Sequence, residues 1–124
     1  MTALVTPRPN AVGAEDAVLV NVDSQGPATS GVLHVGRATL VSLYGQNRSG
    51  STRYIHVHAA DAVPADGAVP CALPIPVAAG GLFAFEPAGG IHGATGLCWV
   101  SSTSSDTTTI TGVADVWLTA TVEI

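Results

Sequence analysis

Short runs of β-branched and aromatic residues, separated by glycine, proline and other turn-forming residues, recur along almost the whole chain. They follow one another at intervals of about ten residues, which is typical of all-β domains. No segment shows the apolar period of about 3.6 residues that marks an amphipathic helix. The pattern predicts an all-β protein, a single β-sandwich of about eight strands, with a jelly roll as the leading topology.

The length of 124 residues suits one domain with a substantial core. Residues 1–16 contain Pro7, Pro9 and Gly13 and have no usable periodicity, so we expect an extended N-terminal arm. Residues 17–124 form the predicted sandwich. Its expected strands cover residues 17–23, 32–37, 39–44, 54–59, 73–77 at an edge, 82–86, 97–102 and 116–124.

The segment from Thr39 to Asp61 carries the pattern of a β-hairpin with a long loop over residues 45–51. Residues 32–37 and 39–44 predict either a strand pair or one strand bent at Gly36. In the second strand of the hairpin, the alternation directs Ile55 and Val57 toward the core. Tyr54, His56 and His58 then share the opposite face.

Charge excludes two classes of partner. The net charge is −5, there are four arginines and no lysine, and only 10% of residues are charged. A nucleic-acid site needs a basic stripe, and a polybasic membrane anchor needs a basic cluster. We therefore expect no nucleic-acid or membrane partner, and the first residues lack the pattern of a secretory signal. The low charge indicates a surface that is covered in part by other protein chains.

From Leu43 onward, an ordered series of short motifs resembles a group of small tailed-bacteriophage virion proteins. The likeness covers about two-thirds of the chain and leaves residues 1–38 outside it. Its motifs are Leu43-Tyr44-Gly45-Gln46-Asn47, Arg53-Tyr54-Ile55, residues 64–70 (PADGAVP), 77–83 (VAAGGLF), 96–102 (GLCWVSS) and 115–120 (DVWLTA).

The resemblance implies a β-sandwich that serves as a non-enzymatic building block of the particle. We expect a head decoration or cement protein, assembled into virions in the bacterial host cytoplasm and binding the major capsid protein or other virion proteins. A tail position is the alternative. The predicted arm would dock on the shell, and we expect a homotrimer without a cofactor. The residues expected at interfaces are Tyr44, Tyr54, His56, His58 and Trp117.

A metal-binding jelly roll of the cupin type is a rival interpretation. Gly50, His56 and His58 fit the beginning of the first cupin motif, and Gly81, Pro87, Gly89 and His92 fit most of the second. Two histidines at i and i+2 share a strand face, so His56, His58 and a third imidazole from His92 would suit a divalent metal. Against this, Ala62 and Val63 occupy the positions of the cupin carboxylate, and Gly96 replaces its asparagine.

Three further features have two interpretations each. The outward aromatic residues, with Trp117 foremost, suit either a protein interface or a carbohydrate-binding platform. Cys71 and Cys98 are expected to be buried thiols, although the sequence does not settle whether they pair. Asp115, just before the last strand, is expected to satisfy turn amides rather than to act in catalysis.

Overall fold

The computed structural model describes residues 4–5 and 18–124, which form strands and loops and contain no helix. They accordingly include no helix with the length and apolarity that a membrane crossing requires. Most of the predicted arm, residues 1–3 and 6–16, lies outside the described residues. The strands are β1 (Leu4–Val5), β2 (Val18–Asp23), β3 (Ser30–Val35), β4 (Ala38–Asn47), β5 (Arg53–His58), β6 (Ile75–Val77), β7 (Leu82–Phe85), β8 (Ile91–Gly93), β9 (Gly96–Ser102) and β10 (Val116–Glu123).

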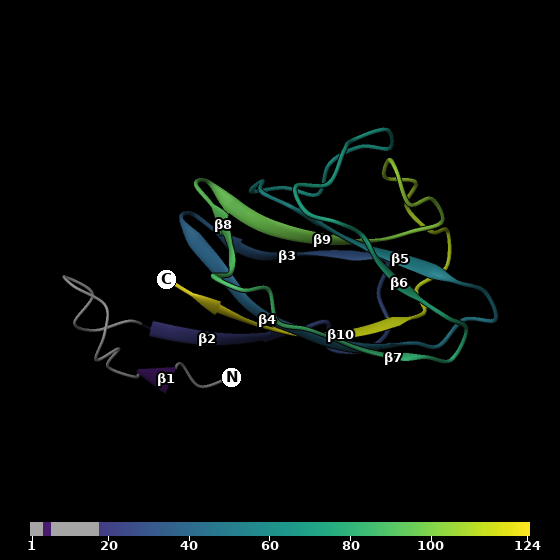
Figure 1. Cartoon of the computed structure of the whole chain (residues 1–124), viewed down its shortest axis with the longest axis horizontal. Helices are drawn as coiled ribbons and strands as arrows, with labels where there is room; N and C mark the ends of the chain where they lie inside the picture. The colour runs from purple at the N-terminus through teal and green to yellow at the C-terminus, as the bar shows by residue number, and fades with distance from the viewer. Residues whose placement is uncertain (1–3, 6–17) are drawn as a thin grey trace.

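Two antiparallel sheets face each other (Figure 1). The first, sheet A, has the order β1-β2-β10-β4-β7, and β8 pairs with β4 next to β7. The second, sheet B, has the order β3-β9-β5-β6. The chain changes sheet between β2 and β3, β3 and β4, β4 and β5, β6 and β7, β8 and β9, and β9 and β10. These crossings confirm the predicted β-sandwich, and the strand order is that of a jelly roll.

The core fills the space between the sheets. Alternating residues of β10 point inward, as predicted from its pattern: Val116, Leu118, Ala120 and Val122 are buried. Burial of these apolar side chains is the main favourable contribution to such a fold. The apolar cluster comprises Leu33, Ala38, Leu40, Leu43, Ile55, Val57, Val77, Phe83, Leu97, Trp99, Val116, Leu118, Ala120 and Val122.

The predicted central hairpin is wrong, because its two strands belong to different sheets. β4 pairs with β10, β7 and β8, whereas β5 pairs with β9 and β6. The buried Asn47 side chain holds the crossing between them: its amide nitrogen donates to the carbonyl oxygens of Ser51 at 2.8 Å and Val77 at 3.0 Å. The sequence pattern cannot distinguish a hairpin from a connection between two sheets. In both cases two alternating strands are joined by the same kinds of turn residues.

The strands on either side of Gly36 are also not paired, contrary to the prediction. β3 lies in sheet B and β4 in sheet A, so the residues between them carry the chain across the sandwich. Gly36 has φ of 101°, a conformation that costs little only for glycine. Gly36 therefore marks the point where the chain changes sheet, and it is not a bulge within one strand.

Two loops cover part of the outer side of sheet B. The β5–β6 connection, residues 59–74, and the β9–β10 connection, residues 103–115, rise together above β5 and β9 (Figure 1). They are tied to each other by backbone hydrogen bonds from Gly67 to the Thr108 carbonyl at 2.8 Å and from Thr108 to the Ala68 carbonyl at 2.7 Å. We call this pair of loops the two-loop cover.

Candidate functional site

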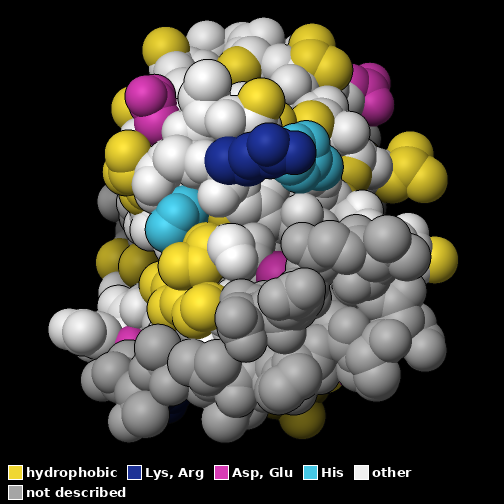
Figure 2. Space-filling model, turned by 90° about the vertical axis from the view of Figure 1, so that its left-hand side faces the viewer, with side chains coloured by type: hydrophobic (Ala, Val, Ile, Leu, Met, Phe, Trp, Pro, Cys, Tyr) yellow, Lys and Arg dark blue, Asp and Glu magenta, His cyan; other side chains and the backbone are white. Residues whose placement is uncertain are grey.

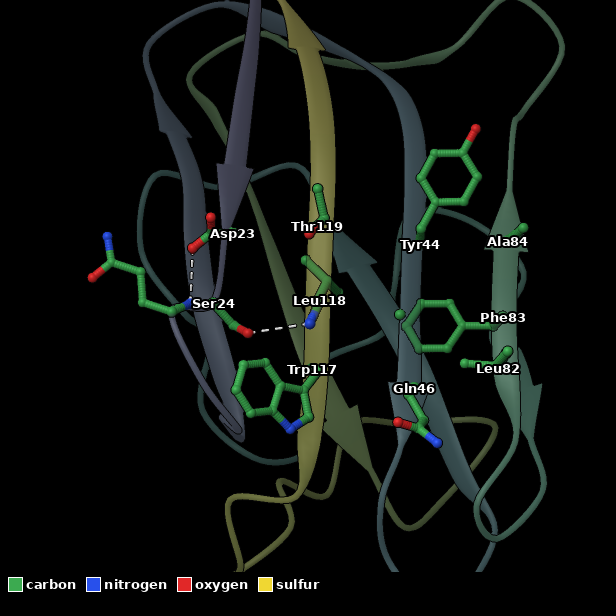
Figure 3. Close-up of a pocket in the computed structure, with 12 residues that line it drawn as sticks. Asp23, Ser24, Tyr44, Gln46, Leu82, Phe83, Ala84, Trp117, Leu118 and Thr119 are labelled. Atoms are coloured by element: carbon green, nitrogen blue, oxygen red, sulfur yellow. Dashed lines mark hydrogen bonds between the residues drawn. The ribbon is translucent and has the colours of Figure 1, made fainter. Parts of the chain in front are cut away.

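The outer face of sheet A carries a hollow lined by residues of three neighbouring strands. A groove with a volume of about 800 Å³ runs over β10, β4 and β7. This volume is within the range usual for small-molecule sites. Figure 3 shows Trp117 and Tyr44 projecting from neighbouring strands, with Leu82 on the far side of β4. We call this surface the open groove.

The strand register explains why these side chains meet. Trp117 pairs with Gln46, which pairs with Leu82, so one row of outward residues crosses three strands. The adjacent row is formed by Asp23, Thr119, Tyr44 and Ala84. Paired residues on one sheet face lie close enough for direct side-chain contact. The open groove is therefore a direct product of alternation in three paired strands.

The floor of the open groove requires a glycine. A Cβ atom placed on Gly45 would lie 2.1 Å from the carbonyl oxygen of Trp117 and 2.5 Å from the Phe83 ring. Figure 3 shows that ring lying against β4, between Tyr44 and Gln46. Gly45 thus lets the β7 aromatic ring and the β10 backbone approach β4 closely.

One wall of the open groove is a fixed turn. Asp23 accepts a hydrogen bond from the Gln25 amide at 2.9 Å, and Gln25 has a left-handed φ of 54°. The Ser24 amide donates to the Leu118 carbonyl at 2.8 Å, and the Ser24 hydroxyl accepts from the Leu118 amide at 3.1 Å. These contacts fasten the turn after β2 to β10, so the wall is preformed.

Charges at the open groove are few and mostly engaged. The Arg48 guanidinium lies 5.6 Å from the centroid of the Trp117 ring, within range of a cation–π interaction. The Tyr44 hydroxyl donates to Glu86, which raises the pKa of Tyr44 above its ordinary value. Exposed apolar area nonetheless dominates: Leu82 is 80% exposed, Tyr44 41% and Trp117 39%. The predicted outward direction of Trp117 and Tyr44 is confirmed.

His56 and His58 lie on the opposite side of the molecule, beneath the two-loop cover. Both are buried, and both bond to the Thr108 hydroxyl: His56 Nδ1 at 2.9 Å and His58 Nε2 at 2.8 Å. Tyr54 is half-buried on the same face. We expected an interface with another chain to cover this face. At both histidines, the chain's own loops cover it instead. Thr108 is a functional neighbour that the sequence does not single out, because it lies in a run of serine and threonine residues typical of an exposed loop tip.

The three histidines of the cupin alternative do not meet. His56 and His58 extend from the outer face of sheet B, away from the space between the sheets, because Ile55 and Val57 occupy the core side. His92 is exposed on β8 of sheet A, where its Nδ1 lies 3.4 Å from the Thr39 hydroxyl. Within residues 4–5 and 18–124, no group of three or more histidine, cysteine or acidic side chains is placed to hold a metal.

Asp115 differs from its expected role in a turn. Its carboxylate accepts a hydrogen bond from Arg53 Nη2 at 3.2 Å, and both side chains are largely buried. Arg53 begins β5 and Asp115 precedes β10, so the ion pair joins the two sheets. This contact gives Asp115 a structural role as a link between the two sheets.

The two thiols differ in environment. Cys98 is buried on β9 beside His58, and burial together with nearby Cys71 and Asp61 raises the pKa of Cys98 to about 11. Cys71 is exposed on the two-loop cover, contrary to the expectation of two buried thiols. Both are free in this structure. A thiol with a raised pKa is a poor nucleophile, so Cys98 is a small apolar side chain in this fold.

No protein-family model matches the chain, and no significant match appears among curated proteins or solved structures.

Proposed function

We propose that this chain is a structural protein of a tailed-phage virion, a capsid decoration or cement protein without catalytic activity. The ordered motif series from Leu43 to Ala120 supports this proposal, as does the jelly-roll strand order, an architecture common among viral capsid proteins. Its partners are the major capsid protein and further copies of itself, with a homotrimer as the expected assembly.

The open groove is the observation that carries the proposal. Leu82, Trp117 and Tyr44 expose apolar surface side by side on a sheet face, in a chain with few charges to keep that face hydrated. Exposed apolar surface of this kind marks a site of protein contact, and tryptophan and tyrosine are enriched in such contacts. In the described part of the molecular end drawn in Figure 2, a few charged side chains lie scattered among apolar and uncharged ones.

The mechanism is mechanical. A decoration protein that binds the assembled shell but not its separated subunits stabilises the assembled state through mass action. An interface of standard size buries on the order of 1,600 Å² in total, more than the open groove provides alone. Contacts from further copies or from the predicted N-terminal arm would supply the remainder.

The direct test is to purify virions of the phage that carries this chain, separate heads from tails, and quantify the chain by mass spectrometry. We expect it in the head fraction, in a fixed ratio to the major capsid protein. Its absence from purified particles would overturn the proposal, and its recovery with tails alone would overturn the decoration role.

A second candidate is carbohydrate binding, which the same groove favours. Trp117 offers a ring face, and Asp23, Gln25 and Gln46 offer polar groups around it. Titration with neutral oligosaccharides, followed by tryptophan fluorescence, separates the two functions. Trp99, the other tryptophan, is buried in the core, so saccharide-dependent quenching would report on Trp117. A saccharide response that Trp117→Ala abolishes would favour this second function.

A further inference from the structure

The contact between His56, Thr108 and His58 joins three separate segments of the chain at one buried hydroxyl. Both imidazoles come from β5, and Thr108 belongs to the β9–β10 loop. The Thr108 backbone in turn bonds to Gly67 and Ala68 of the β5–β6 loop. Other hydrogen bonds also hold the loops to sheet B, among them Cys71 N–H to the Val57 carbonyl and Thr111 N–H to the Ser101 carbonyl, both at 3.0 Å. Thr108 is the residue that joins β5 and both loops at one point.

The number of hydrogens at this contact limits its protonation. A threonine hydroxyl has one hydrogen and two lone pairs. With both imidazoles neutral, the arrangement that gives every group at this contact a partner is the one in which the hydroxyl donates to one ring nitrogen and accepts an N–H from the other. Consider a proton added to the ring nitrogen that accepts from the Thr108 hydroxyl. Both rings then point an N–H group at the Thr108 oxygen, and the hydroxyl hydrogen loses its acceptor. When His56 is charged, both of its ring nitrogens carry a hydrogen. Its Nε2 atom is buried and has no hydrogen-bond partner to receive that N–H group.

The surroundings compensate a positive charge only in part: the Ser104 backbone favours the charged form of His56, but burial outweighs it and lowers the pKa. Among the described residues, neither ring is hydrogen-bonded or ion-paired to a carboxylate. In the two-loop cover, Asp66 instead accepts from the Ile110 amide, and Asp106 accepts from the Ser105 hydroxyl. Together with burial, Cys71 and Asp61 raise the pKa of the neighbouring Cys98. Arg53, at the start of β5, is paired with Asp115.

We propose that the His56–Thr108–His58 contact is an acid-sensitive latch, and that protonation of its imidazoles releases Thr108, together with the Gly67 and Ala68 backbone bonded to it, from β5. This inference concerns the chain alone and does not rest on the proposed virion function. The two ring centroids are 6.1 Å apart, so charging both rings adds repulsion between them. Release exposes the rings to water, where the charged forms are stable.

The direction of the pH effect follows from burial. Burial lowers the pKa of both His56 and His58 below 6.5, and the charge of His56 lowers the pKa of His58 further. The closed state thus binds fewer protons than the released state once the pH falls below the ordinary histidine value. The closed latch is fully favoured above that value and is lost progressively as the pH falls below it.

Amide hydrogen exchange on the intact chain between about pH 7.5 and pH 5 tests the latch, with protection factors corrected for intrinsic rates. We expect protection at Gly67 and Thr108 to fall severalfold toward acid pH, because the released state binds more protons there. Amides of β10 in sheet A should keep their protection. Unchanged protection in the loops, or an equal loss in β10, would overturn the proposal.

A matched variant removes the titration while keeping the contacts. Asparagine mimics the Nδ1 position of histidine and glutamine mimics Nε2, so His56→Asn with His58→Gln retains groups that can bond to Thr108. The double variant should lose the pH dependence of loop protection, whereas His92→Gln, at an exposed histidine, should keep it. Acid-dependent release that persists in the folded double variant would assign the effect to other groups and contradict the latch.

Direct titration of the histidine rings by NMR gives an answer even if the double variant does not fold. In the wild-type chain, two of the four rings should titrate below the ordinary value and in step with the loop amides. Four rings that titrate together near the ordinary histidine value would contradict the proposal.

Discussion

The two outer faces of this sandwich are built by the same alternation and end in opposite environments. On sheet A, Trp117, Tyr44 and Leu82 stay exposed in the open groove. On sheet B, the polar face with His56 and His58 lies beneath the two-loop cover. Buried polar groups must find partners within the chain, and Thr108 provides one here. The apolar groove has no such requirement and remains free for another molecule.

The comparison teaches that residue type alone does not identify an interface. Sequence analysis placed Tyr44, Tyr54, His56, His58 and Trp117 together as interface residues. The structure separates them onto two faces, and the chain's own loop covers the two histidines. Of these five residues, the proposed contact surface retains Trp117 and Tyr44, and it gains Leu82.

A large effect on stability is expected at the covered face. Thr108→Ala removes the hydroxyl from two buried ring nitrogens, and each unpartnered polar atom costs roughly 1–3 kcal/mol. We expect the free energy of unfolding to fall by about 2–4 kcal/mol in urea denaturation at neutral pH. Thr107→Ala, at an exposed neighbour of the same type, should change it by less than about 0.5 kcal/mol. Equal effects of the two substitutions would show that the covered face does not depend on this hydroxyl.

An effect of similar size is expected beneath the open groove. Gly45→Ala places a methyl group against the Phe83 ring and 2.1 Å from the Trp117 carbonyl oxygen, a backbone atom that cannot move aside easily, so the cost should reach or exceed about 3 kcal/mol, the upper end of ordinary overpacking. Gly50→Ala is the matched control, since nothing lies within 4 Å of the added Cβ atom. Thermal unfolding of both variants measures the difference. If Gly45→Ala is as stable as Gly50→Ala, the groove floor is not closely packed.

The positions of the strands could be predicted from sequence more completely than their partners could. Alternation in residues 116–122 identified the inward residues of β10, and the prolines of residues 73–77 marked β6 as an edge. Both signals are local. The partner of β4 depends on contacts far along the chain, which the turn after Asn47 does not reveal. Ile124, expected inside, is half-exposed because β10 ends one residue earlier.

The candidate site was predictable only in part for the same reason. Outward Trp117 and Tyr44 follow from strand alternation, but the row that adds Leu82 depends on the pairing of β4 with β7. Thr108 lies in a run of serine and threonine that resembles a solvated loop. One signal for its burial existed: two histidines that share the outer face of a strand need polar cover if they are to be buried.

The central claim is that the open groove serves contact with another molecule and contributes little to the fold. Leu82 and Leu73 make a matched pair, 80% and 89% exposed, with Leu73 on the two-loop cover. Leu82→Glu and Leu73→Glu should each change the free energy of unfolding by less than about 0.5 kcal/mol.

The most direct measurement is the occupancy of each variant on purified phage heads, relative to wild type. Leu82→Glu places a charge in the groove contact and should reduce occupancy at least about tenfold, whereas Leu73→Glu should leave it unchanged. Full occupancy of Leu82→Glu on heads that bind the wild-type chain would contradict the assignment of the open groove as the contact surface.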